Sequence, residues 1–106
     1  MSNQRSKTVN LQLMRAIAEK RLIEFVYRLG QKRVVEPHDY GIRGGIECLL
    51  GYQLSGGSRS GAYHGWKWFT VAQMHQLCVL EHRFAGTRAD SDQQHSAWDT
   101  LFARVV

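Results

Sequence analysis

The chain has 106 residues, of which 43% are hydrophobic and 22% charged, and a formal net charge of +5. These values are typical of one folded domain with a modest core. No apolar run approaches the roughly 20 residues that a membrane span requires, and the first ten residues lack the apolar centre of a secretory signal. We therefore expect a cytoplasmic protein without membrane contact, whose residues 1–7 are a disordered lead-in.

The positive charge is concentrated in the first part of the chain. Residues 1–43 hold nine Lys or Arg and four acidic residues, a balance of +5, whereas residues 44–106 hold five of each. This asymmetry indicates an anionic partner. A solvated basic face that only aids solubility would give the same pattern.

The two cysteines, Cys48 and Cys78, are both flanked by apolar residues. This context favours free, buried thiols in a reducing compartment over a disulfide. The five histidines are scattered, and none has zinc-finger spacing with a cysteine pair. We therefore expect no metal and no cofactor.

The first elements are a helix and a strand. Apolar residues at helical spacing, among them Leu13 and Ile17, predict a helix over Thr8–Lys20. The apolar period then changes to two, which predicts a strand over Leu22–Leu29 with Tyr27 on its apolar face.

Short strands and small turns follow. A turn at Gly30–Gln31 leads into a second strand over Lys32–Pro37, where the only proline ends regular pairing or lies at a sheet edge. The turn Gly41–Gly45 precedes a third strand, Ile46–Leu54. The glycine- and serine-rich stretch Ser55–Gly65 is a flexible connector by composition.

Two further strands, Trp66–Val71 and Leu77–Phe84, precede a polar loop and an amphipathic C-terminal helix within residues 93–106. The expected fold is α+β and mainly β: a small five-stranded antiparallel barrel with an N-terminal and a C-terminal helix. Closure is favoured because a flat sheet of this size would leave its edges exposed.

The fourth strand has an unusual pattern, HGWKWF. In a strand, Trp66 and Trp68 share one face, and Lys67 and Phe69 share the other. We expect Phe69 in the core and Lys67 at the barrel rim. The two indoles either pack under the C-terminal helix, which we favour, or stack nucleobases or face a partner.

In its order of segments, the stretch 12–84 resembles the WYL-domain family of bacterial regulators. The segment AIAEKRLIEFVYRLG is similar to the family's opening helix and strand, and RVVEPHDY to its second strand. The segment GGIECLLGYQ takes the place of the Trp-Tyr-Leu strand. The closing segment, KWFTVAQMHQLCVLEHRF, is similar to the family's Arg-x-Phe and last strand, with counterparts at Lys67, Phe69, Val71, Met74 and Phe84.

The sequence also departs from the family pattern. The Trp-Tyr-Leu triplet is Glu47-Cys48-Leu49 here, so that only the leucine is kept, and the Arg of Arg-x-Phe is Lys67. The acidic and basic pair that follows is Ala72 and Gln73. These replacements leave open whether a ligand site is retained.

The resemblance implies an Sm-like or SH3-like barrel over residues 8–84, followed by a loop and helix over 85–106. It also implies a ligand-sensing module of transcriptional or defence regulation, for which nucleotides and single-stranded nucleic acid are the usual partners.

Six residues are candidates for ligand contact. Arg33 can grip phosphate through a bidentate fork, and Lys67 can hold its ammonium at the barrel mouth above an apolar stem. The remaining candidates are Tyr27, Trp66 and Trp68 as stacking surfaces and Arg59 in the glycine-rich connector. Each cation also has an alternative without a ligand. Arg33 would then face solvent from its strand, Lys67 would extend its ammonium to solvent at a strand end, and Arg59 would lie in a mobile loop.

Nothing in the sequence resembles a nucleophile elbow or a paired-carboxylate site. We therefore expect a non-catalytic domain that binds an anionic small ligand or a short single-stranded nucleic acid. The alternative is a protein-interaction or oligomerisation module that has lost the ligand site and pairs with itself or with an effector protein.

Overall fold

The computed structural model describes residues 2–57, 64–88 and 98–106, with side chains from residue 8 onward. The elements in chain order are α1 (Ser2–Glu19), β1 (Arg21–Tyr27), β2 (Lys32–Arg43), β3 (Ile46–Gly56), β4 (Gly65–Thr70), the 3₁₀ turn η1 (Val71–Gln73), β5 (Met74–Arg83) and β6 (Thr100–Arg104). Within these ranges no helix has the length and apolarity of a membrane span. The fold is therefore mainly β, as predicted.

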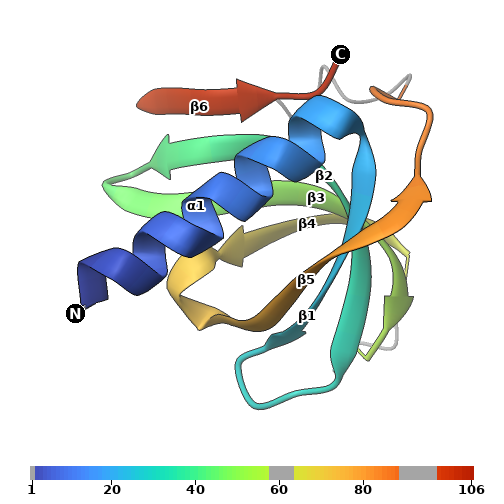
Figure 1. The fold of residues 1–106 in the computed structure, drawn as a ribbon, viewed down its shortest axis with the longest axis horizontal. Coiled ribbons are helices and arrows are strands. Elements are labelled where there is room, and N and C mark those ends of the chain that lie inside the picture. The colour runs from blue at the N-terminus through green and yellow to red at the C-terminus, as the bar shows by residue number, and fades with distance from the viewer. Residues whose placement is uncertain (1, 58–63, 89–97) are drawn as a thin grey trace.

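The strands form one antiparallel sheet in the order β4-β3-β2-β1-β5, with β6 paired to β2. Figure 1 shows the sheet bending sharply while α1 crosses in front of it. The predicted closed barrel is wrong, because β4 and β5 remain the two end strands of the sheet. The three-residue turn Val71–Gln73 carries the chain from one end strand to the other without a backbone ladder between them.

The core lies on the inner face of the bent sheet, under α1. Three aromatic rings meet edge to face there: the centroid of Phe69 is 5.0 Å from those of both Phe25 and Tyr27. The predicted apolar face of β1 is confirmed for Ile23, Phe25 and Tyr27, all of which are buried. Leu29, expected on the same face, is fully exposed because β1 ends at Tyr27 and the chain turns.

The strand β2 is twice as long as predicted and continues past Pro37 to Arg43. Its first half pairs with β1 as far as Val35, and its second half pairs with β6 from Asp39 onward. Pro37 lies between these two pairings, where its missing N–H breaks no ladder bond with either neighbour. A register shift against β3 at Pro37–Asp39 accompanies the change of partner.

The predicted C-terminal helix is wrong over its described part, residues 98–106. This part contains the strand β6, which pairs with the second half of β2 (Figure 1). A free length of β2 edge gives these backbone groups partners in the sheet. The start of the predicted helix, residues 93–97, lies outside the described residues.

A buried carboxylate on the outer face of β2 ties this C-terminal segment to the sheet. Asp39 is fully buried. Its two oxygens accept hydrogen bonds from the Arg104 guanidinium at 3.1 and 3.0 Å and from the Trp98 indole N–H at 3.1 Å. Because a buried carboxylate is costly without such donors, Asp39 depends on the segment as much as the segment depends on Asp39.

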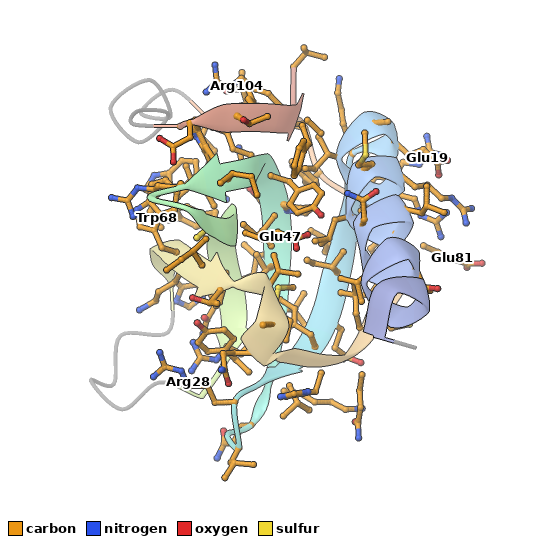
Figure 2. All side chains as sticks on the ribbon, turned by 90° about the vertical axis from the view of Figure 1, so that its left-hand side faces the viewer. Glu19, Arg28, Glu47, Trp68, Glu81 and Arg104 are labelled. Atoms are coloured by element: carbon orange, nitrogen blue, oxygen red, sulfur yellow. The ribbon has the colours of Figure 1, made fainter. Side chains whose placement is uncertain are left out.

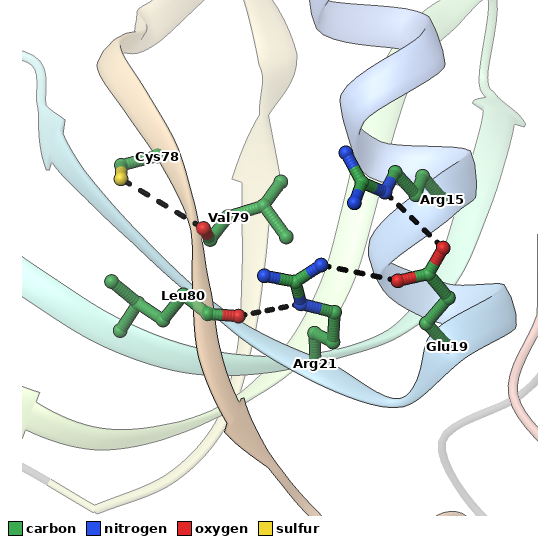
Figure 3. A network of polar contacts seen from close by, with 6 residues as sticks. All are labelled: Arg15, Glu19, Arg21, Cys78, Val79 and Leu80. Atoms are coloured by element: carbon green, nitrogen blue, oxygen red, sulfur yellow. Dashed lines mark hydrogen bonds and ion pairs between the residues drawn. The ribbon is translucent and has the colours of Figure 1, made fainter.

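The end of α1 is tied to two strands by Arg21 (Figure 3). Its Nη1 donates to Glu19 at 3.1 Å, and its Nε donates to the carbonyl oxygen of Leu80 on β5 at 2.7 Å. Arg15, one turn earlier on the helix, also binds Glu19. The helix begins at Ser2, before the predicted start at Thr8, and so includes most of the expected lead-in.

The two cysteines are free, as expected. Cys48 is buried on β3, and burial raises the pKa of its thiol. Cys78, also expected to be buried, is exposed on β5.

Replacing Asp39 with Ala should lower the free energy of unfolding by about 1–3 kcal/mol, because the Arg104 guanidinium and the Trp98 indole N–H then lose their common acceptor. Urea unfolding measures this change. The matched control is Asp99→Ala, which removes an exposed carboxylate whose contact is the backbone N–H of Gly45, and it should cost less than about 1 kcal/mol. Equal losses in the two variants would show that Asp39 does not hold the segment.

Candidate ligand-binding site

One end of the inner face holds an arginine among aromatic rings. The guanidinium carbon of Arg33, near the start of β2, lies 5.2 Å from the ring centroid of Tyr27 and 5.9 Å from that of Phe69. Both distances are within the range of cation–π attraction. Gly56 at the end of β3 allows this packing: its φ is +114°, and a Cβ there would lie 2.7 Å from the Arg33 Cα.

Two hydrogen-bond donors at this place have no partner. The Arg33 Nη1 donates to the Gln53 Oε1 at 3.3 Å, which fixes the orientation of the amide because its NH₂ would repel the guanidinium. The Arg33 Nε and the Gln53 Nε2 are buried and find no hydrogen-bond partner among the described residues. Gln53 is fully buried. An unpaired buried donor costs about 1–3 kcal/mol, so such a group requires an explanation.

Positive charge gathers near these donors. Arg28 lies in the turn after β1. Its guanidinium carbon is 5.2 Å from the ring centroid of Tyr27, the ring that Arg33 also contacts. Burial lowers the pKa of the Arg33 guanidinium, and the charge of Arg28 acts in the same direction. In the described ranges, neither arginine has a carboxylate within ion-pair distance.

The strand register brings Lys67 onto the same face. Lys67 pairs with Gly51, and Phe69 with Leu49, on the two neighbouring strands β4 and β3. A Cβ on Gly51 would point into the core, 2.4 Å from Val35. Lys67 therefore shares the inner face with Gln53, which lies diagonally across from it on β3. The half-buried Lys67 side chain makes no ion pair within the part of the chain that the structure describes.

Tyr27, expected as a stacking surface, is 8% exposed. Its hydroxyl accepts a hydrogen bond from the backbone N–H of Thr70 at 3.0 Å, which locks the ring in the core. The ring meets the guanidinium carbons of Arg33 and Arg28 and is not open to solvent. Its role as a ligand contact stays a prediction.

The two indoles of HGWKWF lie on the outer face, away from this cluster. Trp68 packs against Trp98 with ring centroids 5.4 Å apart, and the Arg43 guanidinium carbon is 4.0 Å from the Trp68 ring centroid. Trp66 meets the rings of His38 at 4.7 Å and Tyr52 at 5.5 Å. The expected cover by the C-terminal segment is thus found for Trp68, although that segment is not helical.

Arginines also pair with the acidic residues of the outer face. Arg88 donates to both carboxylate oxygens of Glu36, at 2.8 and 2.9 Å, and its guanidinium carbon lies 3.5 Å from the Tyr52 ring centroid. Figure 2 shows Arg104, which pairs with Asp39, at the opposite end of the molecule from Arg28. The inner cations and the paired outer arginines are therefore separate groups.

The structure thus brings Arg33, Tyr27 and Phe69 together and places Lys67 on the same face, whereas Arg59 lies outside the described residues. Sequence reasoning missed Arg28 and Gln53. Gln53 is four residues after Leu49, so the period of two along β3 could have placed it on the inner face.

No family model and no curated protein matches the chain. Among solved structures, the chain is similar to the proteasome accessory factor B/C (PafBC) of Arthrobacter aurescens, with a TM-score of 0.55 and 21% sequence identity. The match covers 83% of this chain and 14% of PafBC. At this identity the similarity concerns the fold alone.

Two arginine substitutions should affect stability in different ways. Arg33→Met keeps an apolar side chain against the rings and removes a half-buried charge, but it also leaves the buried Gln53 Oε1 without its donor, so the free energy of unfolding in urea should fall by only about 1 kcal/mol. Arg104→Met, the control, leaves Asp39 short of its ionic partner and should cost about 3 kcal/mol. A loss at Arg33 as large as that at Arg104 would mean that Arg33 serves the fold.

Proposed function

We propose that the chain is a non-catalytic regulatory domain that binds an anionic ligand, most plausibly a nucleotide or short single-stranded nucleic acid, in transcriptional or defence regulation. Arg28, Arg33 and Lys67 would supply the positive charge, and Gln53 a neutral donor. The observation that carries the proposal is a pair of buried donors that have no hydrogen-bond partner among the described residues, the Arg33 Nε and the Gln53 Nε2. An oxygen-rich ligand would satisfy both.

The distribution of charge supports an anion over other ligands. On the outer face the buried Asp39 and Glu36 each have an arginine partner. Arg28 and Arg33 have no carboxylate within ion-pair distance in the described ranges, and the charge of Arg28 disfavours that of Arg33, so an added anion would relieve this repulsion.

The fold comparison supports a regulatory role. PafBC is a WYL-domain-containing regulator, and the fold similarity spans most of this chain. This fold similarity agrees with the resemblance of residues 12–84 to the WYL-domain family. The sequence pattern of that family includes an arginine at the position of Arg33 and a basic residue at the position of Lys67.

Binding to a short oligonucleotide should depend steeply on salt. For single strands the logarithm of the binding constant falls by about 0.7 per phosphate contact for each unit of log salt, so three contacts predict an approximately 20-fold loss between 50 and 200 mM salt. Fluorescence anisotropy with a labelled hexathymidylate measures this loss. Arg33→Ala combined with Lys67→Ala should remove most of the binding.

The matched control for charge is Arg15→Ala combined with Lys32→Ala, since both residues are paired with carboxylates outside the cluster. This control should bind as the wild type does. No binding by the wild type at 50 mM salt, to oligonucleotide or nucleotide, would contradict the proposed function.

The second candidate function is an oligomerisation module, and apolar exposure on β6 favours it. Leu101 and Phe102 are each 39% exposed on this strand, although most large apolar side chains of the described residues are covered. Light scattering should then show a dimer that Leu101→Ser with Phe102→Ser dissociates. A wild-type monomer across concentrations from 10 to 500 μM (roughly the range in which weak dimers form) would exclude it.

A further inference from the structure

We infer that the inner-face cluster recognises a terminal phosphate monoester, with the Arg33 Nε and the Gln53 Nε2 as the donors that bind its oxygens. This inference rests on the proposed function and specifies which part of an anionic ligand the site reads. The same chemical group is present on a free nucleoside monophosphate and at the end of a phosphorylated oligonucleotide.

The arrangement of donors points to a compact oxyanion. The Arg33 Nη1 is already engaged by Gln53, whereas its Nε is buried and lacks a partner among the described residues. The free Nε2 belongs to the same amide that holds this Nη1. The two unpartnered donors thus belong to residues whose side chains are already in contact through one hydrogen bond.

Burial favours a chain end over an internal phosphate. Gln53 is fully buried, and Phe69 beside Arg33 is 1% exposed. A phosphodiester has two ester substituents that must both leave the site, whereas a monoester has one. A monoester therefore requires less space at these buried donors than a phosphodiester does.

The charge of the cluster suits a group with nearly two negative charges. Arg28, Arg33 and Lys67 have no carboxylate within ion-pair distance among the described residues. A phosphate monoester carries roughly −1.5 to −2 at pH 7, whereas a phosphodiester or a carboxylate carries one negative charge. The monoester therefore offsets more of the repulsion between Arg28 and Arg33.

The test compares one hexathymidylate, labelled at its 3′ end, with a 5′-phosphate and with a 5′-hydroxyl. At 100 mM salt the wild type should bind the phosphorylated form at least about tenfold more tightly, as expected for charge-assisted hydrogen bonds. Gln53→Leu should bring this ratio close to one while affinity for the hydroxyl form stays the same. Gln12→Leu is the control, since its amide donates to the Leu77 carbonyl, away from the cluster; it should keep the wild-type ratio.

A competition arm separates the two sources of the group. If thymidine monophosphate displaces the labelled strand and thymidine does not, the site binds free nucleotides. If only phosphorylated oligonucleotides displace it, the site binds strand ends. Both results support a monoester site. Far-UV circular dichroism of Gln53→Leu shows whether the variant is folded, and Gln53→Glu, which adds a repelling charge, should lower the ratio as well.

The failures of the two proposals are distinguishable. Equal wild-type affinity for the two strands, with binding still lost in Arg33→Ala combined with Lys67→Ala, would overturn the monoester inference and leave the proposed function standing. Displacement by a cyclic dinucleotide as effective as that by the monophosphate would do the same. No binding of any phosphorylated probe would overturn both.

Discussion

The half-buried guanidinium of Arg33 lies against aromatic rings of the bent sheet, and no carboxylate of the described residues is within ion-pair distance of it; the proposed role of the molecule depends on this arrangement. Arg33 lies close to Tyr27 and Phe69, and its one hydrogen-bond partner among the described residues is the neutral oxygen of Gln53. The Arg33 Nε is buried without a hydrogen-bond partner among the described residues, and the proposed anionic ligand would supply one.

The outer face of the same sheet shows how charges are arranged for stability. There Asp39 is fully buried and receives donors from Arg104 and Trp98, which fixes β6 against β2. The Arg88 guanidinium donates hydrogen bonds to both carboxylate oxygens of Glu36. One strand, β2, thus has ionic groups satisfied within the chain on its outer face and an unsatisfied cation on its inner face.

The sequence predicted those features that depend on neighbours along the chain. The period of two in β1 identified Ile23, Phe25 and Tyr27 as core residues, and the pattern of β4 assigned Phe69 to the core and the indoles to the other face. The resemblance to the WYL family gave Arg33 and Lys67 as candidates. These predictions succeeded in placing side chains because side chains alternate along any strand, whatever the strand pairs with.

The errors concern contacts between distant parts of the chain. The spacing of apolar residues near the C-terminus is compatible with a helix, but Asp39, 65 residues before Arg104, and the free edge of β2 select a strand. Gln53 was overlooked because a glutamine is usually exposed, and its burial follows from the positions of β2 and β4. Closure was expected from the need to protect edges, whereas the short turn η1 leaves β4 and β5 unpaired with each other.

The central claim is that the Arg33 Nε–H and the Gln53 amide bind an anion directly, and NMR of the ¹⁵N-labelled protein tests it without mutation. On addition of thymidine monophosphate at low salt, the resonances of these two side-chain groups should shift and exchange more slowly with water. The side-chain resonance of Arg104, already paired with Asp39, should stay in place. Unchanged Arg33 and Gln53 signals at saturating nucleotide would contradict the account.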